Sequence, residues 1–159
     1  MKDFLDTPIA DIMTTRIEMV SDTIPLSFAA KLLVDKQITG LPVTTELGEL
    51  VGVLSWADVM RALGDEAGDA AEGKGSYYSE GETMVFDGRT RLDDVEAKVG
   101  DYMSDLIIAV GVDATVRDAV RLMKKGAVHR VLVVDDQGNL AGLVSATDIV
   151  YLVADAIEG

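Results

Sequence analysis

An internal repeat constrains the fold of this chain more than any single motif does. When the sequence is shifted by 90 residues, residues 11–63 align with residues 101–153 without a gap. Both copies end in a glycine and two apolar residues followed by Ser-x-x-Asp, at residues 52–58 and 142–148. A repeat of this kind is typical of a chain that builds the same supersecondary unit twice.

Each copy has the sequence pattern of a β-α-β-β-α unit. Helical spacing of apolar residues predicts the first helix, and apolar runs without polar alternation predict buried strands. The first helices would be capped by Thr23 and by Asp113. The bounds we predict for the two copies are strands at 17–20 and 107–110, helices at 26–33 and 116–123, strands at 41–44 and 131–134, strands at 50–54 and 140–144, and helices from Ser55 to Leu63 and from Ser145 to Ala156.

A unit of this size buries little surface by itself. We therefore expect an α/β (α+β) fold in which two pseudosymmetric β-α-β-β-α units pack face to face. The expected domains are residues 1–63, the first unit, and residues 101–159, the second, joined by an acidic, Gly-rich insert at 64–100. Within the insert we predict a mobile loop at 64–79, a strand at 83–86 and a helix at 92–99. The insert could be a lid or partner-binding segment, but a solvated connector is the preferred interpretation.

Composition argues against several classes of function. The net charge of −14 opposes binding to duplex nucleic acid or to an anionic membrane surface. The absence of cysteine excludes disulfides, thiolate metal sites and a cysteine nucleophile. The N-terminal residues do not resemble a secretion signal and no apolar run is long enough to span a bilayer, so we expect a cytoplasmic protein.

The repeat resembles a tandem pair of CBS (cystathionine β-synthase) domains, a Bateman module. The resemblance rests on the Asp-x-Met starts at 11–13 and 101–103, on Gly-Leu-Pro-Val at 40–43, and on the two Ser-x-x-Asp endings, all in the same order and spacing. It implies a regulatory module that binds AMP, ADP or ATP, with S-adenosylmethionine also possible, in clefts between the units, and that requires no cofactor. It also implies a homodimer, and any regulated protein would be another chain.

For the ligand site, the resemblance points to the ending of the second copy. Asp148 would hold the ribose hydroxyls, because a carboxylate offers two acceptor oxygens, and Ser145 and Thr147 would reach ribose or phosphate. His129 and Arg130 would contact phosphate, which the planar fork of arginine suits. The opposite wall would come from Met13, Ile17, Glu18, Ile38, Thr39 and Gly40, with Ile17, Ile38 and Leu143 around the adenine; for Ile17 and Leu143 plain core packing is an equal alternative.

A second, weaker cleft is expected at the ending of the first copy. It would use Ser55 and Asp58, with Ile108 and Val128 opposite. Ala57 supplies no hydroxyl there, and the basic pair of the other copy has no counterpart. Both aspartates could instead simply cap their helices.

Two further functions remain open at this point. One is an interaction scaffold that dimerises and has vestigial clefts, and the other is a divalent-cation sensor that uses acidic faces. An enzyme is not expected, because the sequence offers no nucleophile–base pair, metal-ligand cluster or phosphate-binding loop. The apolar second helices, around 59–63 and 149–157, would form either the dimer surface or internal core.

Overall fold

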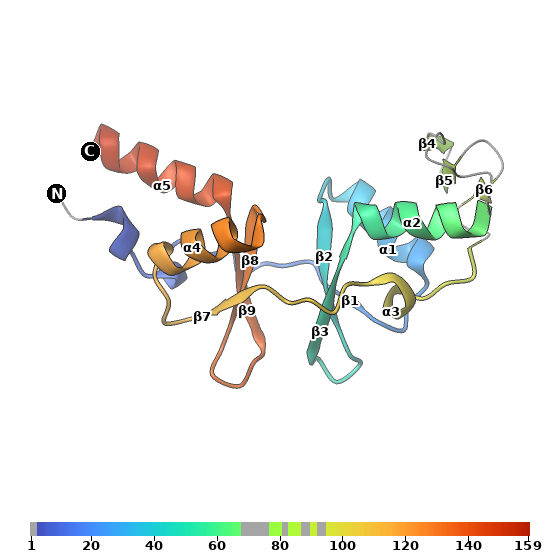
Figure 1. Ribbon diagram of the computed structural model, residues 1–159, viewed down its shortest axis with the longest axis horizontal. Helices are drawn as coiled ribbons and strands as arrows, with labels where there is room; N and C mark the ends of the chain where they lie inside the picture. The colour runs from blue at the N-terminus through green and yellow to red at the C-terminus, as the bar shows by residue number, and fades with distance from the viewer. Residues whose placement is uncertain (1–2, 68–76, 81–82, 87–89, 92–94) are drawn as a thin grey trace. The chain divides into compact units, whose positions relative to one another are not determined.

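Two compact units make up the structure, a computed structural model that describes residues 3–67, 77–80, 83–86, 90–91 and 95–159. The first unit, Glu18–Leu106, contains the first repeat copy from residue 18 onward, and the second unit, Met1–Ile17 with Ile107–Gly159, contains the second copy from residue 107 onward. Figure 1 shows a small sheet with its helices in each unit. Within the described residues, no helix is long and apolar enough to cross a membrane.

The first unit has the predicted β-α-β-β-α order. Its sheet has the order β1-β2-β3, in which β1 and β2 are parallel and β2 and β3 antiparallel. One face of α1 is buried against the sheet through Leu26, Ala29, Ala30 and Leu33, which keep the predicted helical spacing. The elements are β1 (Val20–Ser21), α1 (Leu26–Asp35), β2 (Gly40–Thr44), β3 (Leu50–Ser55) and α2 (Trp56–Ala67).

The second unit repeats this architecture with a separate core. Its sheet has the order β7-β8-β9 with the same parallel and antiparallel pairings. Val131, Val133 and Val144 pack with Val116 and Ala119 of the first helix. The elements are β7 (Ala109–Gly111), α4 (Val116–Gly126), β8 (Arg130–Val134), β9 (Leu140–Ser145) and α5 (Ala146–Glu158).

The segment that precedes the second copy packs on the first unit. Val99, at the start of α3 (Val99–Tyr102), is fully buried in the core of that unit. The amide of Leu26 at the start of α1 donates to the carbonyl of Ala97 (2.9 Å), and the amide of Val99 donates to the carbonyl of Ile24 (3.0 Å). The lead-in thus satisfies a backbone amide that the helix itself leaves without a partner.

The segment that precedes the first copy packs, in the same way, on the second unit. It contains the short 3-10 helices η1 (Phe4–Asp6) and η2 (Ile9–Asp11). Ile9 is fully buried in the core of the second unit, and its amide donates to the carbonyl of Ala114 (2.9 Å). The amide of Val116 in α4 donates to the carbonyl of Thr7 (2.9 Å). The two lead-ins are therefore exchanged between the repeat copies.

The N-terminal end of this lead-in is fixed by charges. Arg117 of α4 donates to Asp3 (2.7 Å) and to Asp6 (3.1 Å). The hydrogen bond from the backbone amide of Leu5, followed by that from Arg117, lowers the pKa of Asp3 below its ordinary value. These same carboxylates raise the pKa of the guanidinium. The exposed pairs add little stability individually, but they hold η1 against the helix that Ile9 helps to cover.

The predicted caps of the first helices are wrong. Pro25 occupies the cap position of α1 without a side-chain hydrogen bond, and the hydroxyl of Thr23 donates to Glu46 instead (3.2 Å). In α4 the cap residue is Thr115, two residues after Asp113. Its amide and its hydroxyl both donate to Asp118, and these bonds lower the pKa of that carboxyl. At α1 the carbonyl of Ala97 accepts from the first helical amide and takes the place of a side-chain cap, whereas α4 has a local cap two residues later than predicted.

The insert is more ordered at its ends than predicted. Residues 64–67 continue α2, and 77–79 belong to β4 (Tyr77–Glu80), so the predicted loop is wrong at these positions, while 68–76 lie outside the described residues. The predicted strand is confirmed as β5 (Thr83–Phe86), which pairs with β4 and with β6 (Thr90–Arg91). The predicted helix at 92–99 is wrong for 95–98, which are not helical and in which Lys98 bridges Pro25 just before α1, and 92–94 lie outside the described residues.

The two second helices differ in exposure. In α2, Val59, Ala62 and Leu63 are fully buried, so this part of the helix is internal core. In α5 no residue is fully covered, and Val150 (63% exposed), Tyr151 (65%) and Ile157 (79%) present apolar surface. Of these two helices, α5 is therefore the one that presents exposed apolar side chains for a dimer contact.

Candidate functional site

The exchanged lead-in forms one border of the candidate site in the second unit. Thr14 and Leu143 exchange two backbone hydrogen bonds (2.9 and 3.0 Å), so residues around Thr14 extend the sheet beside β9. Met13 lies across Gly142, where an added Cβ would come within 2.5 Å of its sulfur. The motif glycine of the second copy thus leaves room for a methionine from the start of the first copy. Met103 and Gly52 repeat this contact in the first unit.

At the carboxyl end of β9, Ser145 and Asp148 form a capping box at the start of α5. The amide and the hydroxyl of Ser145 donate to Oδ2 of Asp148 (2.8 and 2.9 Å), and the amide of Asp148 donates back to Oγ of Ser145 (3.2 Å). Within the described part of the chain, Oδ1 of Asp148 has no hydrogen-bond partner. A carboxylate oxygen carries two lone pairs. Asp148 therefore caps its helix through one oxygen and keeps two acceptor sites on the other.

Three further polar side chains, those of His129, Arg130 and Thr147, belong to the same corner of the second unit, at the start of α5; we call it the Asp148 corner. Arg130 lies directly opposite Ser145 in the β8–β9 register, and residues paired in this way project from the same face of a sheet. The backbone carbonyl of His129 accepts a hydrogen bond from the amide of Ala146 (2.8 Å). This bond does not involve the imidazole ring. The side chains of His129, Arg130 and Thr147 are exposed. This corner can accept hydroxyl donors at Asp148 and can donate to an anion.

The helix start adds a backbone donor. Among the described residues, the amide of Thr147 has no acceptor, whereas its two neighbours donate to His129 and to Ser145. Amides at a helix N-terminus point along the axis and favour bound oxygen atoms with negative charge. The corner therefore combines one acceptor with several donors, an arrangement that suits a ribose carrying phosphate.

The structure brings most of the predicted site residues into one unit. Glu18, Ile38, Thr39 and Gly40 belong to the first unit. The other predicted members all belong to the second unit: Met13, Ile17, His129, Arg130, Leu143, Ser145, Thr147 and Asp148.

Burial separates the three predicted adenine neighbours. Ile38 packs against the core of the first unit, which supports a structural role for it. Ile17 and Leu143 are only partly buried and belong to neither of the two described core clusters. The apolar surface of these two is therefore available on the same unit as Asp148. The predicted members of the weaker cleft, Ile108 and Val128, pack against the core of the second unit, whereas Asp58 belongs to the first unit.

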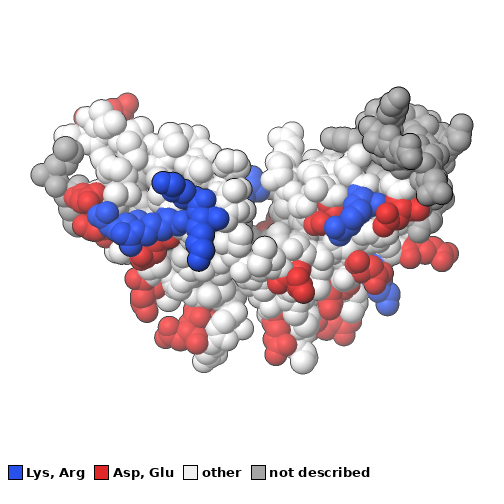
Figure 2. Space-filling model, in the orientation of Figure 1, with Lys and Arg blue, Asp and Glu red and all other residues white. Residues whose placement is uncertain are grey.

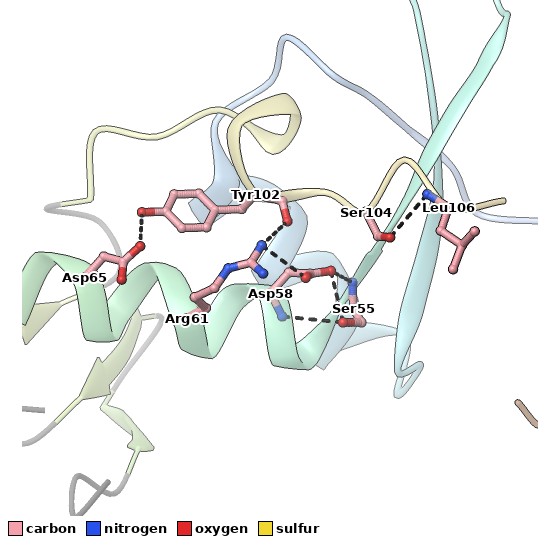
Figure 3. A network of polar contacts seen from close by, with 7 residues as sticks. All are labelled: Ser55, Asp58, Arg61, Asp65, Tyr102, Ser104 and Leu106. Atoms are coloured by element: carbon pink, nitrogen blue, oxygen red, sulfur yellow. Dashed lines mark hydrogen bonds and ion pairs between the residues drawn. The ribbon is translucent and has the colours of Figure 1, made fainter. Parts of the chain in front are cut away.

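Asp58 has the same capping box as Asp148 but a different environment. Ser55 donates to its Oδ2 through the amide (2.8 Å) and the hydroxyl (3.0 Å). Arg61 occupies the other oxygen, with Nη2 lying 3.4 Å from Oδ1. Arg61 also donates to the carbonyl of Tyr102 (2.7 Å) and lies over its ring (Figure 3). The side chain of Asp58 is only 12% exposed.

Sequence reasoning missed this network, although the repeat alignment contains a signal for it. Arg61 aligns with Tyr151, and Tyr102 aligns with Ile12, so neither the cation nor its ring partner exists in the second copy. Asp65, which accepts from the hydroxyl of Tyr102 (2.9 Å), aligns with Asp155. Positions that differ between otherwise matching copies thus mark where the two corners diverge.

Charge is distributed unevenly over the chain. Residues 18–106 contain 18 of the 28 acidic residues, whereas half of the 14 basic residues lie in the second unit. Figure 2 shows Lys and Arg side chains gathered over α4, which contributes Arg121, Lys124 and Lys125. An anion near the second unit therefore meets less repulsion than the net charge implies, since distant surface charges are screened over about 8–10 Å. Among the described residues, no group of three or more His, Asp or Glu side chains is arranged to hold a metal ion.

Comparison with known proteins gives one consistent result. Residues 9–65 and 99–155 match the family model of the CBS domain. The chain is 30% identical over 152 residues to the uncharacterized protein MJ1426 of Methanocaldococcus jannaschii, a match that covers 89% of this chain and 88% of the relative. It is 30% identical over 147 residues to the CBS domain-containing protein CBSX2, chloroplastic, of Arabidopsis thaliana, and covers 61% of that protein's length.

Solved structures show the same likeness. The crystal structure of CBSX2 in complex with AMP superposes with a TM-score of 0.69 at 28% identity, and the match covers 96% of this chain and 99% of that one. A second crystal structure of CBSX2, from Arabidopsis thaliana, gives a TM-score of 0.72 at 25% identity. The two-unit fold is therefore that of a CBS pair.

Proposed function

Because the chain belongs to the CBS domain family, we propose that it is a regulatory, non-catalytic module that binds one adenosine nucleotide at the Asp148 corner. The observation that carries this proposal is the free Oδ1 of Asp148, which lies at a helix start with an unused amide, three residues after Ser145, the strand partner of Arg130. Two lone pairs on this oxygen match the two adjacent hydroxyls of a ribose. The AMP complex of CBSX2 supports the ligand class.

The donors around Asp148 favour a ligand with phosphate. His129 and Arg130 present cationic and hydrogen-bonding groups, and the amide of Thr147 adds a neutral donor. AMP, ADP and ATP offer oxygen acceptors to these groups, whereas S-adenosylmethionine brings a positively charged sulfur. The adenine would lie against Ile17 and Leu143. The predicted contribution of Glu18, Thr39 and Gly40, which belong to the first unit, stays a prediction.

Regulation requires a partner outside the site. A second copy of the chain would cover the apolar surface of α5 at Val150, Tyr151 and Ile157. The regulated protein whose activity follows the bound nucleotide would be a different chain.

Thermal unfolding with a ligand panel tests the proposed function. A ligand at about 100 times its Kd, bound only to the native state, stabilises by about 2.7 kcal/mol, which raises Tm by about 5–10 °C in a chain of this size. We expect such a shift with AMP, ADP or ATP in nucleotide-stripped protein. No shift with any of these or with S-adenosylmethionine would contradict the proposal and favour a scaffold. Stabilisation by Mg²⁺ or Ca²⁺ alone would favour a cation sensor.

Substitution of Arg130 tests the phosphate contact. Arg130→Gln should weaken AMP binding about 10- to 100-fold, because a hydrogen bond to a charged group contributes about 1.5–3 kcal/mol. Adenosine, which lacks phosphate, should lose less than about threefold. Arg121→Gln removes the same charge from the exposed face of α4 and serves as the control, with little effect on either ligand. Calorimetry with both ligands measures the difference, and equal losses for AMP and adenosine would assign Arg130 to packing.

A further inference from the structure

The two Ser-x-x-Asp corners are built alike but differ in what occupies the second carboxylate oxygen. In both, Oδ2 accepts the amide and hydroxyl of the serine at the helix start. At Asp148, Oδ1 has no partner among the described residues, whereas at Asp58 it faces the guanidinium of Arg61 at 3.4 Å. The oxygen that we assign to ribose in the second unit is therefore the one that a side chain of the protein occupies in the first.

Arg61 is fixed by more than the aspartate. It donates to the backbone carbonyl of Tyr102 (2.7 Å), and its guanidinium lies 5.6 Å from the centre of the tyrosine ring. The hydroxyl of Tyr102 in turn donates to Asp65, one helical turn further along α2 (2.9 Å). Figure 3 shows this chain of contacts running from Ser55 to Asp65 along one side of α2. An exposed ion pair is weak by itself, but here three contacts position one guanidinium.

We infer that Arg61 closes the Asp58 corner to nucleotide, so that the chain binds a single ligand, at Asp148. This inference rests on the proposed function. Arg61 places a positive charge beside Asp58 and uses the acceptor that the ribose needs, at a carboxylate that is only 12% exposed. The second copy has Tyr151 and Ile12 at the positions of Arg61 and Tyr102, and its aspartate remains open. The difference between the corners is thus set by residues outside the Ser-x-x-Asp motif.

The repeat itself supplies the test. Arg61→Tyr introduces the residue that the second copy has at this position, and Ala57→Thr supplies the hydroxyl that Thr147 provides there. We expect wild-type protein to bind one AMP per chain in calorimetry. The double variant should bind a second AMP, more weakly than the first, because Thr39 and Gly40 supply no basic pair. Affinity at the Asp58 corner should rise about 10- to 100-fold. Adding Asp58→Asn should return the stoichiometry to one, and Trp56 fluorescence with circular dichroism verifies that the first unit stays folded.

The outcomes separate the closure from the proposed function. One AMP per chain in both wild type and the folded double variant would overturn the closure while leaving the Asp148 site intact. Two AMP in wild type, one of them lost in Asp58→Asn, would also overturn it. If the wild-type protein binds no AMP, the proposed function is overturned. A double variant that then binds AMP through Asp58 would still support the closure. A double variant that also binds no AMP would overturn both.

The reverse graft gives a second measurement that does not depend on the first unit. Tyr151→Arg with Ile12→Tyr builds the arginine and its tyrosine partner beside Asp148. AMP affinity should fall about tenfold or more. Unchanged affinity in the folded variant would contradict the closing role of this arginine position.

Discussion

Asp148→Asn is expected to weaken AMP binding by about a hundredfold or more while the second unit stays folded. The ribose hydroxyls would lose charge-assisted hydrogen bonds to Oδ1, each of which contributes about 1.5–3 kcal/mol, and 1.4 kcal/mol corresponds to a factor of ten. Asparagine can still accept the bonds from Ser145 through its amide oxygen, so the cap of α5 is retained. Asp148→Ala should lose binding as well, but it also removes the cap, at about 1 kcal/mol of stability.

The first repeat copy provides the matched control. Asp58→Asn makes the same chemical change in a corner with the same capping box, but there the outer oxygen faces Arg61. This variant should bind AMP as the wild type does. The loss of the Asp58 carboxylate, which pairs with Arg61, changes only the stability of the first unit. Calorimetry of the two variants side by side measures the effect. Equal AMP affinity in the Asp148→Asn variant and the wild type would contradict the assignment of Asp148 as the ribose ligand.

Ile9→Ala is expected to destabilise the second unit by about 2–5 kcal/mol, the range for truncation of a large buried aliphatic side chain. Ile9 is fully buried and packs with residues of the second unit more than 100 positions away, among them Val116, Val131 and Val144. Amide hydrogen exchange should therefore accelerate in β8 and β9, by about 30-fold to a few thousandfold if those amides exchange by unfolding of this unit. Peptides from β2 and β3 should keep their protection.

The equivalent position in the other lead-in supplies a reciprocal variant. Val99→Ala opens a cavity in the core of the first unit, where Val99 is fully buried. Exchange should accelerate in β2 and β3 and not in β8 and β9. The opposite pattern, with Ile9→Ala loosening residues 40–55, would mean that the units follow the order of the sequence and that the lead-ins are not exchanged.

The repeat, its β-α-β-β-α pattern and the resemblance to CBS pairs could be predicted from sequence, and all three are confirmed. The reason is physical: the apolar positions of α1 and α4 keep helical spacing, and β2 and β8 are apolar runs buried by those helices. Such local periodicity survives in one sequence without any knowledge of tertiary partners.

Exchange of the lead-ins could not be predicted in the same way. Ile9 and Val99 lie in short segments without periodicity, and their partners are distant in sequence. The predicted cap of α1 failed for this reason, because the carbonyl of Ala97 serves the first amide of that helix. The contact between Gly142 and Met13 shows what was missed, because the motif glycine leaves room for the lead-in of the other copy.

The candidate site was only partly accessible to sequence reasoning. The Ser-x-x-Asp endings pointed to the two carboxylates, but not to the commitment of Oδ2 to the helix cap in both copies. The expectation of a weaker first corner rested on Ala57 and on the missing basic pair. Arg61 supplies a stronger physical reason, and it depends on a side-chain conformation that spacing alone does not determine.

Calorimetric titration of purified, nucleotide-stripped protein with AMP, with ADP, ATP and S-adenosylmethionine in parallel and with and without Mg²⁺, tests the central claim most directly. The account predicts saturable binding of an adenosine nucleotide at one per chain, with S-adenosylmethionine weaker than the phosphorylated ligands. Absence of binding heat for all four ligands at two temperatures, in protein shown to be folded and stripped, would contradict it. In that case the Ser-x-x-Asp endings would be helix caps and the chain an interaction scaffold.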